Sequence, residues 1–265
     1  SGEANLYAAI LDSKTFFRGR ALVEVEAGAE LTLIENLSSQ GKENVYATST
    51  RVKVQKGGTL HYILKQDTPL DTRSFNFLEI EAHESAQVHV TLLNLGGNYV
   101  RQEITAFIKG KHAKVNLHSL SLANGMQEID QRTLQIHEAP DAKSDLLFKN
   151  ILDDKARTVF SGLIRVAVGA QKTDAYQKNR NLMLSEEAQA NSLPGLEIEA
   201  NDVRCTHGAT CGRLSEEELF YLRSRGVPQR EAKRMLVAGY AEEILESLPE
   251  DLAIWAREKI EERLK

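Results

Sequence analysis

The sequence predicts an all-β core with an α-helical tail, in which the core is a right-handed parallel β-helix (a β-solenoid). One observation is a sequence pattern that recurs through the first two thirds of the chain: a strand of alternating apolar and polar residues, a tight turn with a small residue, and a second such strand. The other is a change of composition after Gly212, where signals for short helices begin. We therefore expect a parallel β-helix over residues 1–213 and a helical region over residues 214–265.

The repeat is regular enough to indicate stacked units. Successive copies are 27 to 29 residues apart, measured between small turn residues. These markers are Ala29, Gly58, Ala86, Ala113, Ala142 and Ala170. A period of this length is typical of repeat folds in which each unit stacks on the next. Stretches such as Val88–Leu92 alternate apolar and polar residues, which places one strand face on a core. A β-sandwich is disfavoured, because its turns recur every 8 to 12 residues without a longer period.

The tail carries start and stop signals for three helices. Ser215 and Glu218 form a capping box ahead of an apolar run, and Gly226 is placed to end that first helix. Pro228 suits the first turn of a second helix, and a third helix is expected to begin near Pro249. The predicted tail is therefore a small helical unit.

Composition excludes several classes of protein. Among the 265 residues the net charge is −5 and basic residues are scattered, so nucleic acid is not expected as a partner. No apolar run approaches the length of a membrane span, and the first residues, Ser1–Asn5, lack a secretory signal pattern. Cys205 and Cys211 are the two cysteines and imply no disulfide framework. We expect a cytoplasmic protein without membrane contact.

Catalytic signatures are missing from the sequence. There is no Gly-x-x-x-x-Gly-Lys-Ser/Thr phosphate loop, no His-Glu-x-x-His and no Gly-x-Ser-x-Gly. We therefore expect no nucleotide bound by this chain and no enzymatic activity. A solenoid enzyme acting on polysaccharides is the alternative, and the lack of a secretion signal and the single Trp255, in the tail, count against it.

The segment whose residues are best suited to bind a metal or a cluster lies where the strands meet the tail. If it is extended, Cys205 and His207 lie on one strand face with Cα atoms about 6.5 Å apart. Thiolate and imidazole bind soft metals and iron–sulfur species, but two ligands do not complete a site, so a second chain would supply the others. Equally open is a structural role, with Cys205 as a small buried hydrophobe and His207 as a hydrogen-bonded histidine. Cys211 is expected to pack. Solvated or structural roles are expected for His61, His83, His89, His112, His118 and His137.

The run Ile198–Thr210, continuing through Glu217–Gly226, closely resembles the C-terminal region of the SufB/SufD family of iron–sulfur cluster assembly proteins. The segments Val25–Glu35 and Ser161–Ile164 are similar to the family as well, so the resemblance extends over nearly the whole chain. It implies a parallel β-helix flanked by helices, a SufB-like homologous partner, and a SufC-like ABC ATPase bound by the C-terminal helical region. A transient iron–sulfur cluster would form at the subunit interface, and a homodimer is a further option for the chain in isolation.

Departures from the family pattern favour the SufD-like branch. SufB contributes the main cysteine and SufD a histidine across the interface; the matching histidine is His207, and Cys205 matches a nearby SufD cysteine. Asn179 stands where SufB has its cysteine, and Gly208 replaces the glutamate that follows the histidine of SufB. The helical N-terminal region usual in SufD is not in this sequence. The competing interpretations are a scaffold subunit with cluster ligands and a structural interaction module without cluster or metal ligands.

Overall fold

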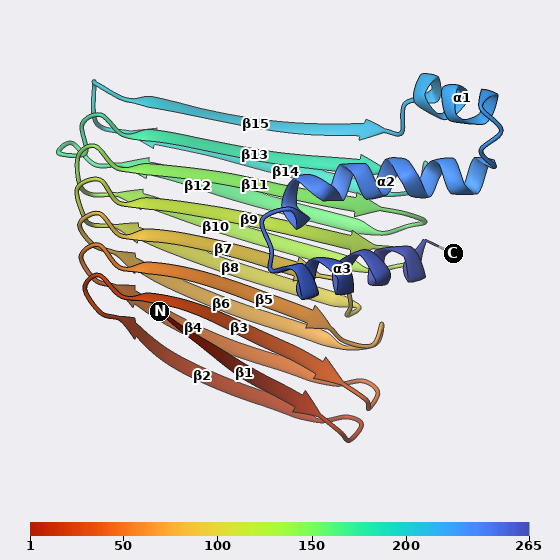
Figure 1. The fold of residues 1–265 in the computed structure, drawn as a ribbon, viewed down its shortest axis with the longest axis horizontal. Coiled ribbons are helices and arrows are strands. Elements are labelled where there is room, and N and C mark those ends of the chain that lie inside the picture. The colour runs from red at the N-terminus through yellow and green to blue at the C-terminus, as the bar shows by residue number, and fades with distance from the viewer. Residues whose placement is uncertain (265) are drawn as a thin grey trace.

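The computed structural model describes residues 1–264 as a parallel β-solenoid with three C-terminal helices (Figure 1). Successive strands alternate between two sheets. The eight-stranded sheet contains β1 (Gly2–Ile10), β3 (Glu30–Ser39), β5 (Thr59–Asp67), β7 (Gln87–Asn94), β9 (Lys114–Ala123), β11 (Lys143–Leu152), β13 (Asp174–Met183) and β15 (Arg204–Arg213). The seven-stranded sheet contains β2 (Phe16–Val25), β4 (Val45–Val54), β6 (Arg73–Ala82), β8 (Tyr99–Ile108), β10 (Glu128–His137), β12 (Arg157–Val166) and β14 (Gln189–Ile198). The predicted parallel β-helix with a helical tail is confirmed.

Strand neighbours within a sheet are one repeat apart in sequence. Gly2 pairs with Leu31, and Thr59 pairs with Gln87. The described strand pairs are parallel, so the alternative of two antiparallel sheets is wrong. The predicted turns also form: the amide of Ala86 donates to the carbonyl of His83 at 3.0 Å.

The space between the two sheets is filled by inward side chains of both. One row consists of apolar residues, including Leu60, Val88 and Val115, each fully buried and in register with the next. A second row is polar, and we call it the polar lane: Gln66, Asn94, Ser121, Asn150 and Asn181. Asn94 donates to Gln102 of the opposite sheet at 3.0 Å, so the lane lies inside the coil.

The helices α1 (Glu216–Ser224), α2 (Gln229–Leu245) and α3 (Glu250–Arg263) begin as predicted. The hydroxyl of Ser215 accepts from the amide of Glu218 at 3.2 Å, which confirms Ser215 as the N-cap and one of the two hydrogen bonds of the predicted capping box. Gly226 has a φ of +87°, a left-handed conformation that suits glycine after a helix. Pro228 and Pro249 stand immediately before α2 and α3.

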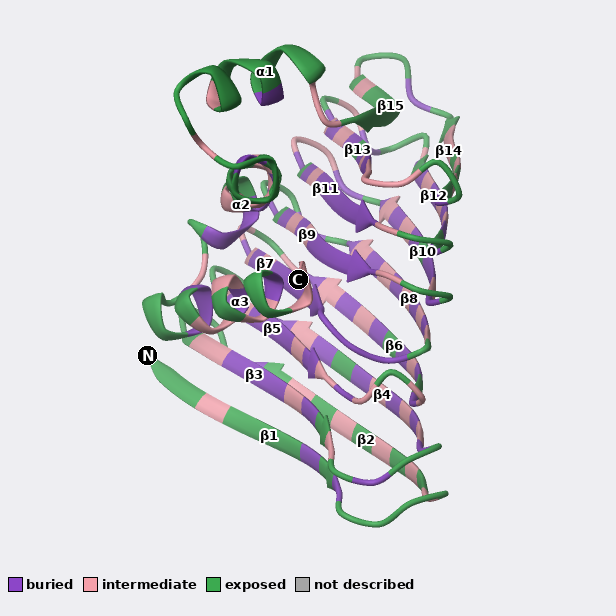
Figure 2. Ribbon diagram, turned by 90° about the vertical axis from the view of Figure 1, so that its right-hand side faces the viewer, coloured by how far each residue is buried: buried purple, intermediate pink, exposed green. Residues whose placement is uncertain are grey.

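The two sheets differ in what covers their outer faces. Helices α2 and α3 lie over the eight-stranded sheet, while α1 lies beyond α2 and contacts it (Figure 2). Buried apolar side chains of sheet and helices form one cluster: Leu93, Leu95, Leu120, Leu122, Leu147, Ile151, Leu182, Val237, Ala241, Ile244, Leu245, Ala256 and Ile260. At the end of α3 the guanidinium of Arg263 donates to the carbonyl of Leu122 at 2.9 Å. No described helix is long and apolar enough to cross a membrane.

Candidate functional site

Cys205 and His207 belong to β15, the last strand of the eight-stranded sheet (Figure 1). The register places Cys205 beside Ala175 and His207 beside Gln177, and both of these β13 neighbours are fully buried inside the coil. Because side chains in register point the same way, Cys205 and His207 are inward-facing positions. Cys205 is half-buried and His207 is exposed, since no further turn of the coil covers them. The predicted extended segment and shared strand face are present.

Cys211 extends this row, which we call the end row: Cys205, His207 and Cys211. Its side chain shares their parity and is exposed, contrary to the expectation that it packs in the core. Six residues of strand separate the two cysteines by about 20 Å, so they cannot ligate one ion together. Across residues 1–264, no three His, Cys, Asp or Glu side chains are gathered as a metal site.

The surroundings of Cys205 are apolar. Its side chain packs at the edge of a buried cluster that includes Ile164, Val166 and Ala200. Burial raises the pKa of the Cys205 thiol, and the nearby charge of Asp174 acts in the same direction. At neutral pH the group is therefore a thiol, and binding a metal requires loss of its proton.

The polar lane reaches the end row. The amide of Asn150 donates to Asn181 at 2.9 Å, and the Nδ2 of Asn181 lies 3.7 Å from the Sγ of Cys211. Asn179 is fully buried, and its Oδ1 accepts from the hydroxyl of Ser192 at 2.6 Å. Its Nδ2 has no partner among the described residues. The interior beneath the Cys211 end of the row is therefore polar, whereas the interior beneath Cys205 is apolar.

Sequence reasoning did not find this polar interior. Asn150 and Asn181 occupy inward positions of successive turns, and that spacing of one repeat was the available signal. A buried amide needs a hydrogen-bond partner, and a second amide one turn away supplies it. Amides repeated with the period of the coil thus identify an internal polar row.

The fold and the end row define a solenoid scaffold: a stacked coil whose last strand exposes thiol and imidazole groups that would be interior in any longer coil. A family model described as "SUF system FeS cluster assembly, SufBD core domain" matches residues 9–240. The chain belongs to the SufB/SufD family and within it is SufD-like.

Individual relatives agree with this membership. The iron–sulfur cluster assembly protein SufD of Escherichia coli (strain K12) is 34% identical over 232 residues, which cover 86% of this chain and 54% of that protein. An iron–sulfur cluster assembly SufBD family protein of Synechocystis sp. is 30% identical over 239 residues, which cover 87% of this chain and 53% of that protein. Protein ABCI7, chloroplastic, of Arabidopsis thaliana is 29% identical over 233 residues, which cover 87% of this chain and 49% of that protein. The chain thus spans about half the length of these curated relatives, and its family role is in iron–sulfur cluster assembly.

Proposed function

We propose that the chain is a non-enzymatic scaffold subunit of a cytoplasmic iron–sulfur cluster assembly complex. It pairs through the end of its coil with a SufB-like homologous subunit, and it docks a SufC-like ABC ATPase through its helical tail. The observation that carries the proposal is the end row, where inward side chains lie exposed on a terminal strand.

The last strand of each sheet offers a surface for such a partner. Among residues 1–264, strand β15 pairs only with β13 and β14 pairs only with β12, so each keeps one free edge. A free edge presents unpaired N–H and C=O groups, which a strand of another chain can complete. A second coil added there would cover the end row and place its own ligands beside His207 and Cys205. The same surface allows a homodimer when the chain is alone.

The nascent cluster is cargo in this scheme. His207 is the stronger candidate ligand because its imidazole is exposed, whereas the Cys205 thiol is half-buried in apolar surroundings. Imidazole and thiolate both suit iron, and the partner completes the ligand set. The chain itself binds no nucleotide; the ATPase supplies that chemistry.

Within the helical tail, different helices pack on the coil and remain exposed for docking a partner. Helices α2 and α3 use their apolar faces to cover the eight-stranded sheet. Helix α1 buries Leu219 but leaves Phe220 73% and Tyr221 58% exposed. Exposed aromatic side chains on one short helix are typical of interface anchors. We therefore place the ATPase contact on α1.

The ligand role is tested by reconstituting the complex from this chain, a SufB-like subunit and a SufC-like ATPase. His207→Ala is expected to leave thermal stability and subunit assembly unchanged while iron and sulfide content falls severalfold. Cys205→Ala is expected to act in the same direction but less strongly. His112→Asn is the matched control, because His112 is an exposed turn residue far along the chain. Wild-type iron and sulfide in both variants would overturn the site assignment.

A structural interaction module without cluster ligands remains the second candidate, and the apolar packing of Cys205 favours it. It predicts a different pattern in the same reconstitution. His207→Ala and Cys205→Ala would then weaken assembly or lower the melting temperature, and cluster content would fall only in proportion to the complex formed.

Docking of the ATPase is tested by a pull-down with Phe220→Ala/Tyr221→Ala. Removing residues 227–265 tests only α2 and α3, because it leaves α1 in place, and it also strips the cover from Leu120 and Ile151. The double variant is expected to lose at least tenfold in affinity. Met126→Ala is the control, since Met126 is 82% exposed in a turn of the coil. Undiminished binding of the double variant rules out α1 as the docking element.

A further inference from the structure

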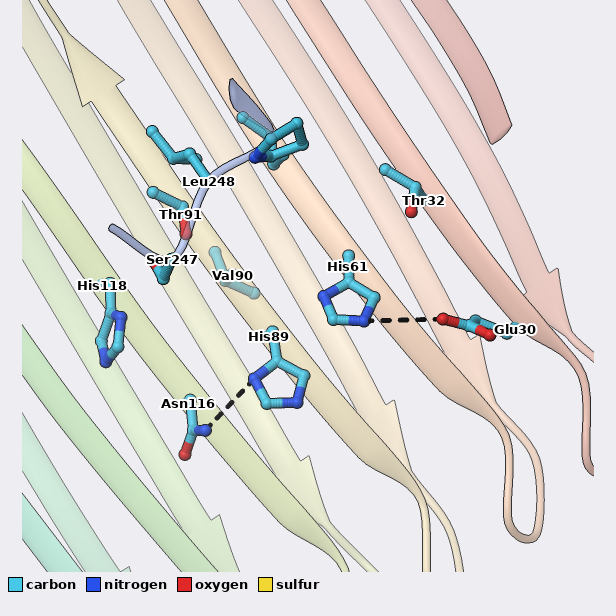
Figure 3. Close-up of a pocket in the computed structure, with 12 residues that line it drawn as sticks. Glu30, Thr32, His61, His89, Val90, Thr91, Asn116, His118, Ser247 and Leu248 are labelled. Carbon is cyan, nitrogen blue, oxygen red and sulfur yellow. Dashed lines mark hydrogen bonds and ion pairs between the residues drawn. The ribbon is translucent and has the colours of Figure 1, made fainter. Parts of the chain in front are cut away.

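Three ligand-type side chains line one cavity on the outer face of the eight-stranded sheet, away from the end row. Glu30, His61 and His89 come from the neighbouring strands β3, β5 and β7. They line a cavity of about 330 Å³, which is closed on another side by the 247–249 turn between α2 and α3 (Figure 3). The sheet thus brings together groups that are 28 or more residues apart in sequence.

The two imidazoles are neighbours because of the strand register. His61 pairs directly with His89, and their rings stack with centroids 4.9 Å apart and planes 9° apart. The Nε2 of His61 lies 3.9 Å from a carboxylate oxygen of Glu30. That separation is too long for a hydrogen bond. Two metal–ligand bonds of about 2.1 Å each span up to about 4.2 Å, so one ion fits between these two atoms.

We propose that Glu30, His61 and His89 form a binding site for a divalent first-row transition metal ion, with Fe²⁺ and Zn²⁺ best suited to the donors. Two imidazoles and one carboxylate are a known ligand set for these ions, and they leave positions open to water. His61 and Glu30 already stand at bridging distance. The site does not depend on the proposed function.

His89 would complete the ligand set when the metal ion binds. Within residues 1–264 no three such groups are already gathered, so the His89 side chain would shift about its Cα–Cβ bond to bring Nε2 to the ion. In Figure 3 its second ring nitrogen lies on the side away from Asn116. This nitrogen is the free donor, because Nδ1 is 3.2 Å from the amide nitrogen of Asn116. An Asn116 amide that follows the shifted ring and turns by half presents its oxygen to Nδ1–H, which would orient the ring with Nε2 free to ligate.

Glu30 is the negative group facing the pair, while His118 stands 4.0 Å from Asp145 and is not part of the proposed site.

The test is a titration of the whole chain with Co²⁺, read by visible absorption, and with Zn²⁺, read by calorimetry. Cys205→Ser/His207→Ala/Cys211→Ser serves as the background, so that the end row cannot contribute. We expect one ion per chain. His61→Ala and His89→Ala should each weaken binding 10- to 100-fold, and Glu30→Gln less.

Two further variants make the result specific. Asn116→Leu should weaken binding about tenfold, because an outer partner that orients a ligating histidine has that order of effect. His112→Asn and His118→Ala should leave the affinity unchanged, which separates this site from scattered histidines. Thermal melts check that each variant is folded. Absence of saturable binding, or an affinity in the His61→Ala and His89→Ala variants equal to that of the background protein, overturns the proposal.

Discussion

The two sheets of the coil are built from the same repeat but differ in how many of their faces are buried. In β11 of the eight-stranded sheet, Leu146, Leu147 and Phe148 are all buried, because inward residues meet the other sheet and outward residues meet α2 and α3. In β8 of the seven-stranded sheet, buried and half-exposed residues alternate along the whole strand. A continuous apolar run therefore marks a strand that is covered on both faces, and alternation marks one that is covered on one.

The largest difference is expected from truncating one outward apolar residue on each sheet. Ile151→Ala should cost about 4 kcal/mol, because Ile151 is fully buried under the helices and its loss leaves a cavity. Leu163→Ala is the matched change on the seven-stranded sheet, where the side chain is half-buried, and should cost about 1 kcal/mol. Chemical denaturation of both variants measures the two free energies of unfolding. Equal losses would contradict the distinction between the sheets.

A pH effect of about 3 kcal/mol is expected from the interior that the sheets share. Burial lowers the pKa of His137 to about 4, and its Nε2 lies 2.9 Å from the hydroxyl of Ser144. The folded protein binds this proton less readily than the unfolded chain. The contribution of the neutral His137 side chain to the free energy of unfolding is therefore complete above about pH 6.5 and is lost as the pH falls toward 4.

The check is the free energy of unfolding of the protein and of His137→Gln at several pH values between 7 and 4. The stability of the variant should depend less steeply on pH, with the difference growing through this window. His112→Asn, at an exposed position, should keep the slope of the unmodified protein. An unchanged slope in His137→Gln would show that His137 is not the group that titrates.

The smallest expected difference concerns ion pairs on the two outer faces. Under α2, Lys149 is paired with Glu243, and its side chain is only 4% exposed; its ammonium also donates to the carbonyl of Tyr240 at 2.7 Å. On the seven-stranded sheet, Arg51 and Glu79 are 2.7 Å apart, with side chains 60% and 36% exposed. Double-mutant cycles should give a coupling of about 1 kcal/mol for the first pair and about 0.3 kcal/mol for the second. A larger coupling for the exposed pair would contradict this order.

The coil and its tail could be predicted because their signals are local or strictly periodic. The small residues near positions 86 and 113 mark the turns, and Ser215, Pro228 and Pro249 mark helix starts. The position of α2 and α3 over one sheet could not be predicted from their own apolar residues, which suit packing and docking equally. The information lay in the strands, where residues such as Leu147 break the alternation.

The candidate site was predicted only in part. Cys205 and His207 were expected on one strand face, and they are. The exposure of Cys211 was not foreseen, because strand parity alone does not show that the coil ends at β15. His61 and His89 were considered unrelated, although they are 28 residues apart, which is one repeat. In a coil, that interval places residues side by side, so ligand spacing has to be counted in repeats rather than in neighbouring positions.

The regular register has a consequence for how such a protein can change its length. Each turn contacts only the turns before and after it, so the insertion of one complete repeat would leave the existing neighbours of most residues intact. Each added repeat lengthens the stack by one strand spacing, about 4.8 Å. The insertion of repeats can therefore change the distance between the His61–His89 pair and the end row only in such steps.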